Sequence, residues 1–99
     1  MEFLEPWYAA TDPAALARQL RSELPRDHVL AGIEVEALAQ RQDRDDVLFA
    51  LIDNSDRVAV VHLTFSVNTH ANWPLTSFYP SLSAWASQRM VSDHDEFAA

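Results

Sequence analysis

The chain has four histidines, the side chains best suited to proton transfer near neutral pH. His62 lies in an alternating apolar segment and shares a face with Val58 and Val60. It can fill a half-buried position and bond a carbonyl or carboxylate. Alternatively, it can act as a general base or ligand at a pocket on the sheet. His62 is therefore the candidate catalytic residue, with the structural role as its alternative.

An irregular polar segment, residues 66–78, contains two of the three candidate binding residues. Trp73 stands before a proline, where the backbone is extended. An exposed loop aromatic can anchor a partner, and it can equally fold back as a lid on its own core. Trp73, His70 and His62 are the predicted binding residues.

A metal site could combine His62, His70 or His94 with Asp93 or Asp95, because nitrogen and carboxylate oxygen suit zinc or manganese. Their spacing does not fix them on one face, so these residues are weak candidates. The sequence predicts no metal and no cofactor.

Several catalytic classes lack their motifs. Gly32 is the only glycine, which excludes the glycine-rich phosphate-binding loops. There is no H-E-x-x-H and no G-x-S-x-G. The absence of cysteine excludes disulfides, thiolate metal sites and a cysteine nucleophile.

Length and charge limit the classes of partner. With 99 residues the chain forms one domain, 1–99. The net charge of −8 disfavours nucleic acid and favours a basic protein surface. No apolar run is long enough to span a membrane, and the first residues lack the features of a signal peptide. We therefore expect a cytoplasmic protein with no membrane partner.

The first half of the chain predicts an N-terminal arm over 1–11 and a helix over about 13–24. The arm carries four large apolar residues, which favours docking on the body of the protein. Asp12 and Pro13 are typical of a helix start, and leucines every four residues form one stripe.

The pattern then changes to the period of strands, over about 30–39, 46–53 and 57–65. A strong turn signal, residues 53–56, separates the last two strands. Short connections predict a three-stranded antiparallel meander.

A second helix is expected over about 80–91, with Ser92 and Asp95 as a capping box for one further turn. Two helices and a small sheet predict an α+β two-layer sandwich, with both helices on one face. Five residues are expected to form its central core: Leu20, Phe49, Val61, Leu63 and Trp85.

The other face of the last strand carries Val58, Val60, His62 and Thr64. We expect the arm and a second copy of the chain, as a homodimer, to cover this apolar face. His62 would then be shielded from solvent and hydrogen-bonded.

Several segments together resemble a group of small uncharacterised bacterial proteins over about residues 28–97. These segments are Asp45-Asp46-Val47-Leu48-Phe49, Ala59-Val60-Val61-His62-Leu63-Thr64-Phe65, Trp73-Pro74, Phe78-Tyr79, Trp85 and Met90. The resemblance implies that the helix–meander–helix unit is a complete domain. It implies no activity, cofactor or partner.

Two functions follow as hypotheses. The first is a protein–protein interaction module, of inhibitor or immunity type, which small size, acidity and the missing catalytic motifs favour. The second is a small-ligand- or metal-dependent enzyme, with His62 as base and residues 66–77 as a lid. A pocket beside His62 with a carboxylate in reach would favour the enzyme.

Overall fold

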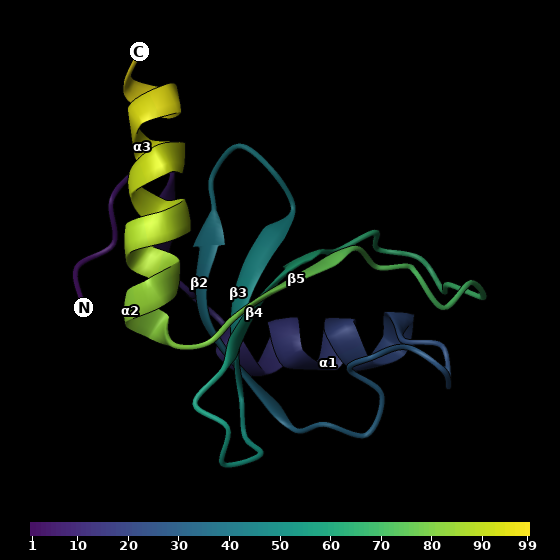
Figure 1. Cartoon of the computed structure of the whole chain (residues 1–99). Helices are drawn as coiled ribbons and strands as arrows, with labels where there is room; N and C mark the ends of the chain where they lie inside the picture. The colour runs from purple at the N-terminus through teal and green to yellow at the C-terminus, as the bar shows by residue number, and fades with distance from the viewer.

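Five strands form one antiparallel sheet in the computed structural model of the chain, which describes residues 1–99 (Figure 1). In sequence order and in sheet order they are β1 (Trp7–Ala9), β2 (Val35–Arg41), β3 (Asp46–Leu51), β4 (Val58–His62) and β5 (Thr76–Tyr79). The α+β class is confirmed, but the prediction of three strands is wrong. The arm supplies β1 and the irregular segment supplies β5, each too short to show a strand period and each at a sheet edge.

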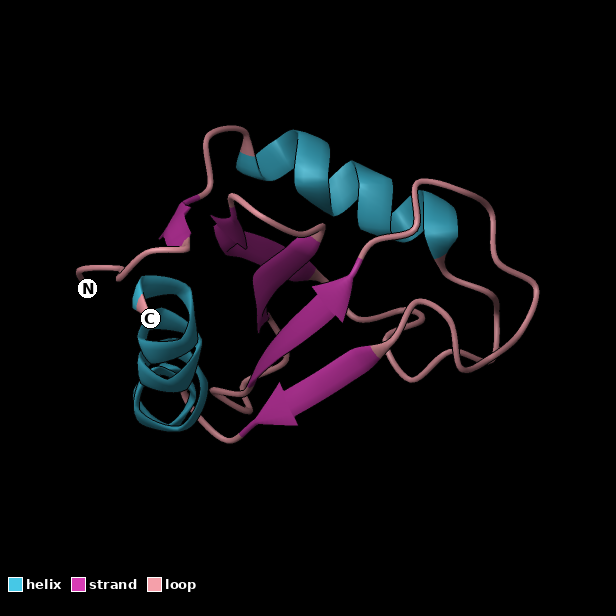
Figure 2. Ribbon diagram, turned by 90° about the horizontal axis from the view of Figure 1, so that it is seen from above, coloured by secondary structure: helices cyan, strands magenta, loops and turns pink.

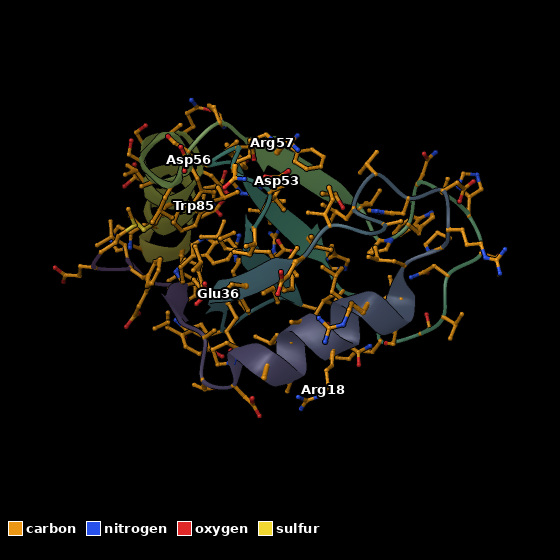
Figure 3. All side chains as sticks on the ribbon, turned by 90° about the horizontal axis from the view of Figure 1, so that it is seen from below. Arg18, Glu36, Asp53, Asp56, Arg57 and Trp85 are labelled. Carbon is orange, nitrogen blue, oxygen red and sulfur yellow. The ribbon has the colours of Figure 1, made fainter.

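The first helix, α1 (Pro13–Glu23), follows its local signals. The side chain of Asp12 accepts a hydrogen bond from the backbone N–H of Ala15 at 3.2 Å, as an N-cap residue does. Leu20 is buried against the sheet, whereas Arg18 points away from it (Figure 3). The N-cap thus sets the start of α1, and the stripe of leucines sets its buried face.

The C-terminal helix runs without a break through α2 (Leu82–Trp85), a π-helical turn η1 (Ala86–Met90) and α3 (Val91–Ala98). Ser81 caps it by accepting from the N–H of Ala84 at 3.1 Å. The expected new start at Ser92 is wrong, because this residue lies inside α3 and no proline or glycine interrupts the helix. No helix in the structure is both long and apolar enough to cross a membrane.

The two helices cover opposite faces of the sheet, so the fold has three layers and not two (Figure 2). The face under α1 buries Ala17, Leu20, Leu30, Val35, Ala37, Val47, Phe49, Leu51, Ala59, Val61 and Leu63. The face under the C-terminal helix buries Trp7, Ala39, Leu48, Val58, Val60, Trp85 and Met90. A strand that is apolar on both sides requires a cover on both, and each helix supplies one.

The expected single core is therefore divided. Trp85 belongs to the second face, where its ring meets that of Trp7 edge-on, with centroids 5.2 Å apart. Val58 and Val60 are buried there by the arm and the C-terminal helix. The apolar face that was expected to need a second copy is covered within one chain.

Candidate functional site

His62 ends β4 at the rim of the sheet, directly opposite Asp46 at the start of β3. Its Nδ1 lies 2.7 Å from Asp46 Oδ1. The hydrogen bond agrees with expectation, but the expected shielding is wrong, because the His62 side chain is 47% exposed. The C-terminal helix covers β4 at Val58 and Val60 and leaves the end of the strand open.

The hydrogen bond to Asp46 decides which ring nitrogen of His62 is free. A carboxylate only accepts, so Nδ1–H is the donor and Nε2 is the unprotonated nitrogen of the neutral ring. Nε2 has no partner within the chain. A carboxylate that orients one ring nitrogen while the other stays free is the arrangement of a general base.

A cavity of about 370 Å³ opens beside this pair. Its walls are Asp46, Val60, His62, Trp73, Leu75, Ser77 and Arg89, and we call it the His62 cavity. The predicted binding residues His62 and Trp73 meet there, whereas His70 lines no cavity and binds the N–H of Asn72. Sequence reasoning did not pair Asp46 with His62, although folding a hairpin about the 53–56 turn places the two residues opposite each other.

Arg89 enters the cavity from η1, the π-helical turn. Its Nε donates to Asp93 at 2.9 Å, Nη1 to the hydroxyl of Tyr79 at 3.3 Å, and Nη2 to Asp46 at 3.4 Å. Burial lowers the pKa of Arg89, but the Tyr79 bond and the charge of Asp93 outweigh burial and raise it above its ordinary value. Arg89 is thus a fixed cation, and no pattern in the sequence identified it.

Behind the cavity, Asp93 is the centre of a buried ionic network. Its Oδ2 accepts from Trp7 Nε1 at 2.9 Å and lies 3.1 Å from Arg41 Nη1. Arg41 also binds Asp43 through two hydrogen bonds, and these are the main reason that the pKa of Asp43 falls below its ordinary value. The network joins the arm, two strands and the C-terminal helix.

The weak metal candidates do not converge. Asp93 is engaged in the network, and His94 donates from Nδ1 to the backbone carbonyl of Glu5 at 2.6 Å. No group of three or more histidine or carboxylate side chains is placed to hold a metal ion.

A second cavity, of about 380 Å³, lies beside β5 and contains His28, so we call it the His28 cavity. Its walls are His28, Val29, Ala71, Asn72, Pro74, Leu75, Thr76 and Phe78. His28 is buried. Its Nε2 donates to the carbonyl of Pro74 at 2.8 Å and its Nδ1 accepts from the N–H of Leu30 at 3.0 Å, so the ring joins two loops.

Glu23 is a buried carboxylate that holds the start of the β4–β5 connection. It accepts from the backbone N–H of Thr64 at 2.7 Å and of Phe65 at 3.0 Å, and from the side chain of Gln19 at 2.8 Å. Phe65 takes a positive φ of 56°, which is strained for a bulky residue, and its side chain is exposed. Glu23 therefore stabilises a conformation that presents an aromatic ring to solvent.

No protein-family model, curated protein or solved structure matches this chain. The structure defines it as an α+β protein with a histidine–carboxylate pair at the edge of an open cavity.

Proposed function

We propose that this protein is an interaction module that binds a basic protein partner through the β4–β5 connection and β5. One observation carries the proposal: large apolar side chains are exposed along a single segment of the chain. They are Phe65, Val67, Trp73, Leu75 and Phe78. Figure 1 displays this connection reaching well beyond the sheet. Exposed apolar residues gathered in one region are typical of an interaction surface.

Trp73 is the expected anchor of the partner. It is 42% exposed and forms a wall of the His62 cavity, so a partner side chain can contact both the ring and the cavity. Tryptophan is enriched among the residues that dominate binding energy, and its face attracts lysine and arginine. Phe65, held by Glu23, is the second anchor.

The charge of the chain supports a basic partner. A net charge of −8 on 99 residues accelerates the approach of a cationic surface. An inhibitor or immunity-type role is the finer form of this proposal, and it rests on size and acidity. Membership of the bacterial group named above remains a prediction.

Selection from a random peptide display library on the immobilised protein tests the proposal. We expect selected peptides enriched in Arg and Lys, and we expect Trp73→Ala to weaken their binding about tenfold or more. Ile52→Ala is the matched control, because Ile52 is a comparably exposed apolar residue outside this segment. Selected peptides without basic enrichment, or binding unaffected by both Trp73→Ala and Phe65→Ala, would overturn it.

A second candidate function follows from the His62–Asp46 hydrogen bond of 2.7 Å at the rim of the His62 cavity. In this alternative His62 is the general base of an enzyme acting on a small ligand, with residues 66–77 as its lid. A panel of ester, amide and phosphoester substrates, run with His62→Asn in parallel, distinguishes the two. Turnover that disappears in the variant supports the enzyme, and turnover equal in both proteins excludes His62 as its base.

A further inference from the structure

β5 is an open edge of the sheet, since it pairs with β4 on one side and with nothing on the other (Figure 2). At this edge Leu75 is 50% exposed and Phe78 is 38% exposed. Unpaired strand edges with exposed apolar residues bind further strands unless they are protected.

The hydrogen-bond pattern fixes which backbone groups face outward. The N–H of His62 donates to the carbonyl of Leu75 at 2.9 Å, so Leu75 bonds toward β4. In an antiparallel ladder this direction alternates, so Ser77 and Tyr79 also bond toward β4. The N–H and C=O groups of Thr76 and Phe78 therefore point to the open edge.

Proline limits this edge at both ends. The next outward positions are Pro74 and Pro80, and neither has an N–H group. Pro74 is buried and its carbonyl accepts from His28 Nε2 at 2.8 Å, so the edge is open over Thr76–Tyr79. The outward donors are thus the N–H groups of Thr76 and Phe78. The outward position before Thr76 and the one after Phe78 are both prolines, which have no donor. This pattern is symmetric about Ser77.

We propose that β5 pairs with β5 of a second copy of this chain, antiparallel, about a two-fold axis at Ser77. The N–H and C=O groups of Thr76 in one copy then bond to the C=O and N–H groups of Phe78 of the partner subunit. Phe78 of the first copy bonds in the same way to Thr76 of the partner subunit. The paired segment is Thr76–Phe78 of each copy, so every outward donor finds an acceptor and none is left over. The symmetry of the donor pattern favours a second copy over an unrelated strand.

The same register covers the exposed apolar residues. Side chains alternate between faces, so Leu75 lies opposite Tyr79 of the partner subunit, on the side of the His62 cavity. Phe78 lies opposite Thr76 of the partner subunit, on the side of the His28 cavity. Each cavity thereby gains a wall from the second copy.

Charge repulsion opposes this dimer, so its stability should depend on salt concentration. Each copy carries −8, so association must overcome like-charge repulsion. At the edge itself Arg57 lies 5.0 Å over the Phe78 ring, but it pairs with Asp53 at 3.3 Å and so does not offset this repulsion. We expect the dimer to strengthen several-fold between about 0.05 and about 0.5 M NaCl, because salt screens exposed charges.

Cysteine cross-linking tests the register, and the chain has no cysteine of its own. Across the proposed axis Ser77 faces its symmetry mate as a non-hydrogen-bonded pair, about 4.5 Å apart at Cα, which a disulfide can span. We expect Ser77→Cys to form a covalent dimer under mild oxidation. Val91→Cys, at an exposed apolar position on α3, is the matched control and should remain monomeric.

Sedimentation of the protein without added cysteine gives the second readout. Thr76→Pro removes an outward donor and spares every bond to β4, so it should abolish dimerisation with little change in melting temperature. If Thr76→Pro fails to fold, Phe78→Asp replaces it and should likewise abolish dimerisation. A protein that stays monomeric up to about millimolar concentration, or Ser77→Cys that cross-links no faster than Val91→Cys, would overturn the proposal.

This inference goes beyond the proposed function, because self-pairing uses the edge of β5 whereas Trp73 and Phe65 anchor the basic partner, so the two fail separately. A monomer that still binds basic peptides at Trp73 removes self-pairing and leaves the interaction module intact. A dimer through Ser77 that selects no basic peptide supports self-pairing and removes the basic partner.

Discussion

Both faces of the sheet carry a helix, but their interiors differ in chemistry. Under α1 the core is apolar, and the buried carboxylate of Glu23 is stabilised in its charged form by N–H and hydroxyl donors without any cation. Under the C-terminal helix, Asp46 and Asp93 share Arg89. Charged groups in an interior must keep hydrogen-bond partners or opposite charges. The His62 cavity lies on the charged face, beside residues that can bind or transfer protons.

The largest loss of stability is expected at the apolar centre of the charged face. Trp85→Ala should lower the free energy of unfolding by about 3–5 kcal/mol, as truncation of a fully buried aromatic does. Trp85→Phe should cost less, because it also removes an indole N–H that has no partner. Denaturant titration measures both, with the exposed Phe97→Ala as control. A loss below about 1 kcal/mol for Trp85→Ala would mean that the C-terminal helix does not pack on the sheet as described.

The next effect should come from the ionic network. Asp93→Asn leaves Arg41 and Arg89 without their shared carboxylate and should cost about 3 kcal/mol. In an Arg41→Met background Asp93→Asn should lower the free energy of unfolding by less, because only Arg89 then loses its bond to Asp93. Additive losses in the double variant, again by denaturant titration, would contradict a coupled network.

The buried carboxylate on the α1 face should contribute less, and in a pH-dependent way. Burial raises the pKa of Glu23, but hydrogen bonds from Gln19, Thr64 and Phe65 outweigh burial and lower the pKa below 4.5. A lowered folded pKa gives stability that is present above the unfolded pKa and is lost as pH falls through the folded pKa. Glu23→Gln should therefore cost about 1–3 kcal/mol at pH 7.

In acid, the difference between the parent protein and Glu23→Gln should close as pH falls below about 4.5. Denaturant titrations at neutral and acidic pH measure that difference. A difference that persists at low pH would show that the carboxylate does not act through its charge. A melting temperature of the parent protein that rises steadily from pH 7 to pH 4 would mean that repulsion among its acidic groups dominates.

The smallest effect on stability is expected at His62. Its ring is half exposed, so His62→Ala should cost less than about 1 kcal/mol despite the Asp46 hydrogen bond. A loss above about 2 kcal/mol would assign His62 to the fold rather than to a site. Together with the Asp93→Asn measurement, this experiment separates a residue that stabilises the fold from a residue that faces the cavity.

Local chemistry was enough to predict several elements from the sequence. Asp12 and Pro13 mark the start of α1, and the alternating segments mark β2, β3 and β4. The 53–56 turn was identified from residues that tolerate positive φ, and Asn54 and Asp56 take values of 66° and 61°. For the helix start and the turn, the stabilising interaction lies within a few residues of the signal, and β2, β3 and β4 pair with strands that are their neighbours in sequence.

The tertiary structure decided which strands form the edges of the sheet, which helix covers each face, and which residues line the His62 cavity. β1 and β5 are strands because β2 and β4 offer them hydrogen bonds, and their own residues are too few to show a period. The same strands can be covered by two helices on one face or by one on each. Arg89 joins the cavity from a helix 43 positions beyond Asp46. Such pairings are chosen by the free energy of burying two apolar faces at once, which depends on the whole chain and leaves no local pattern.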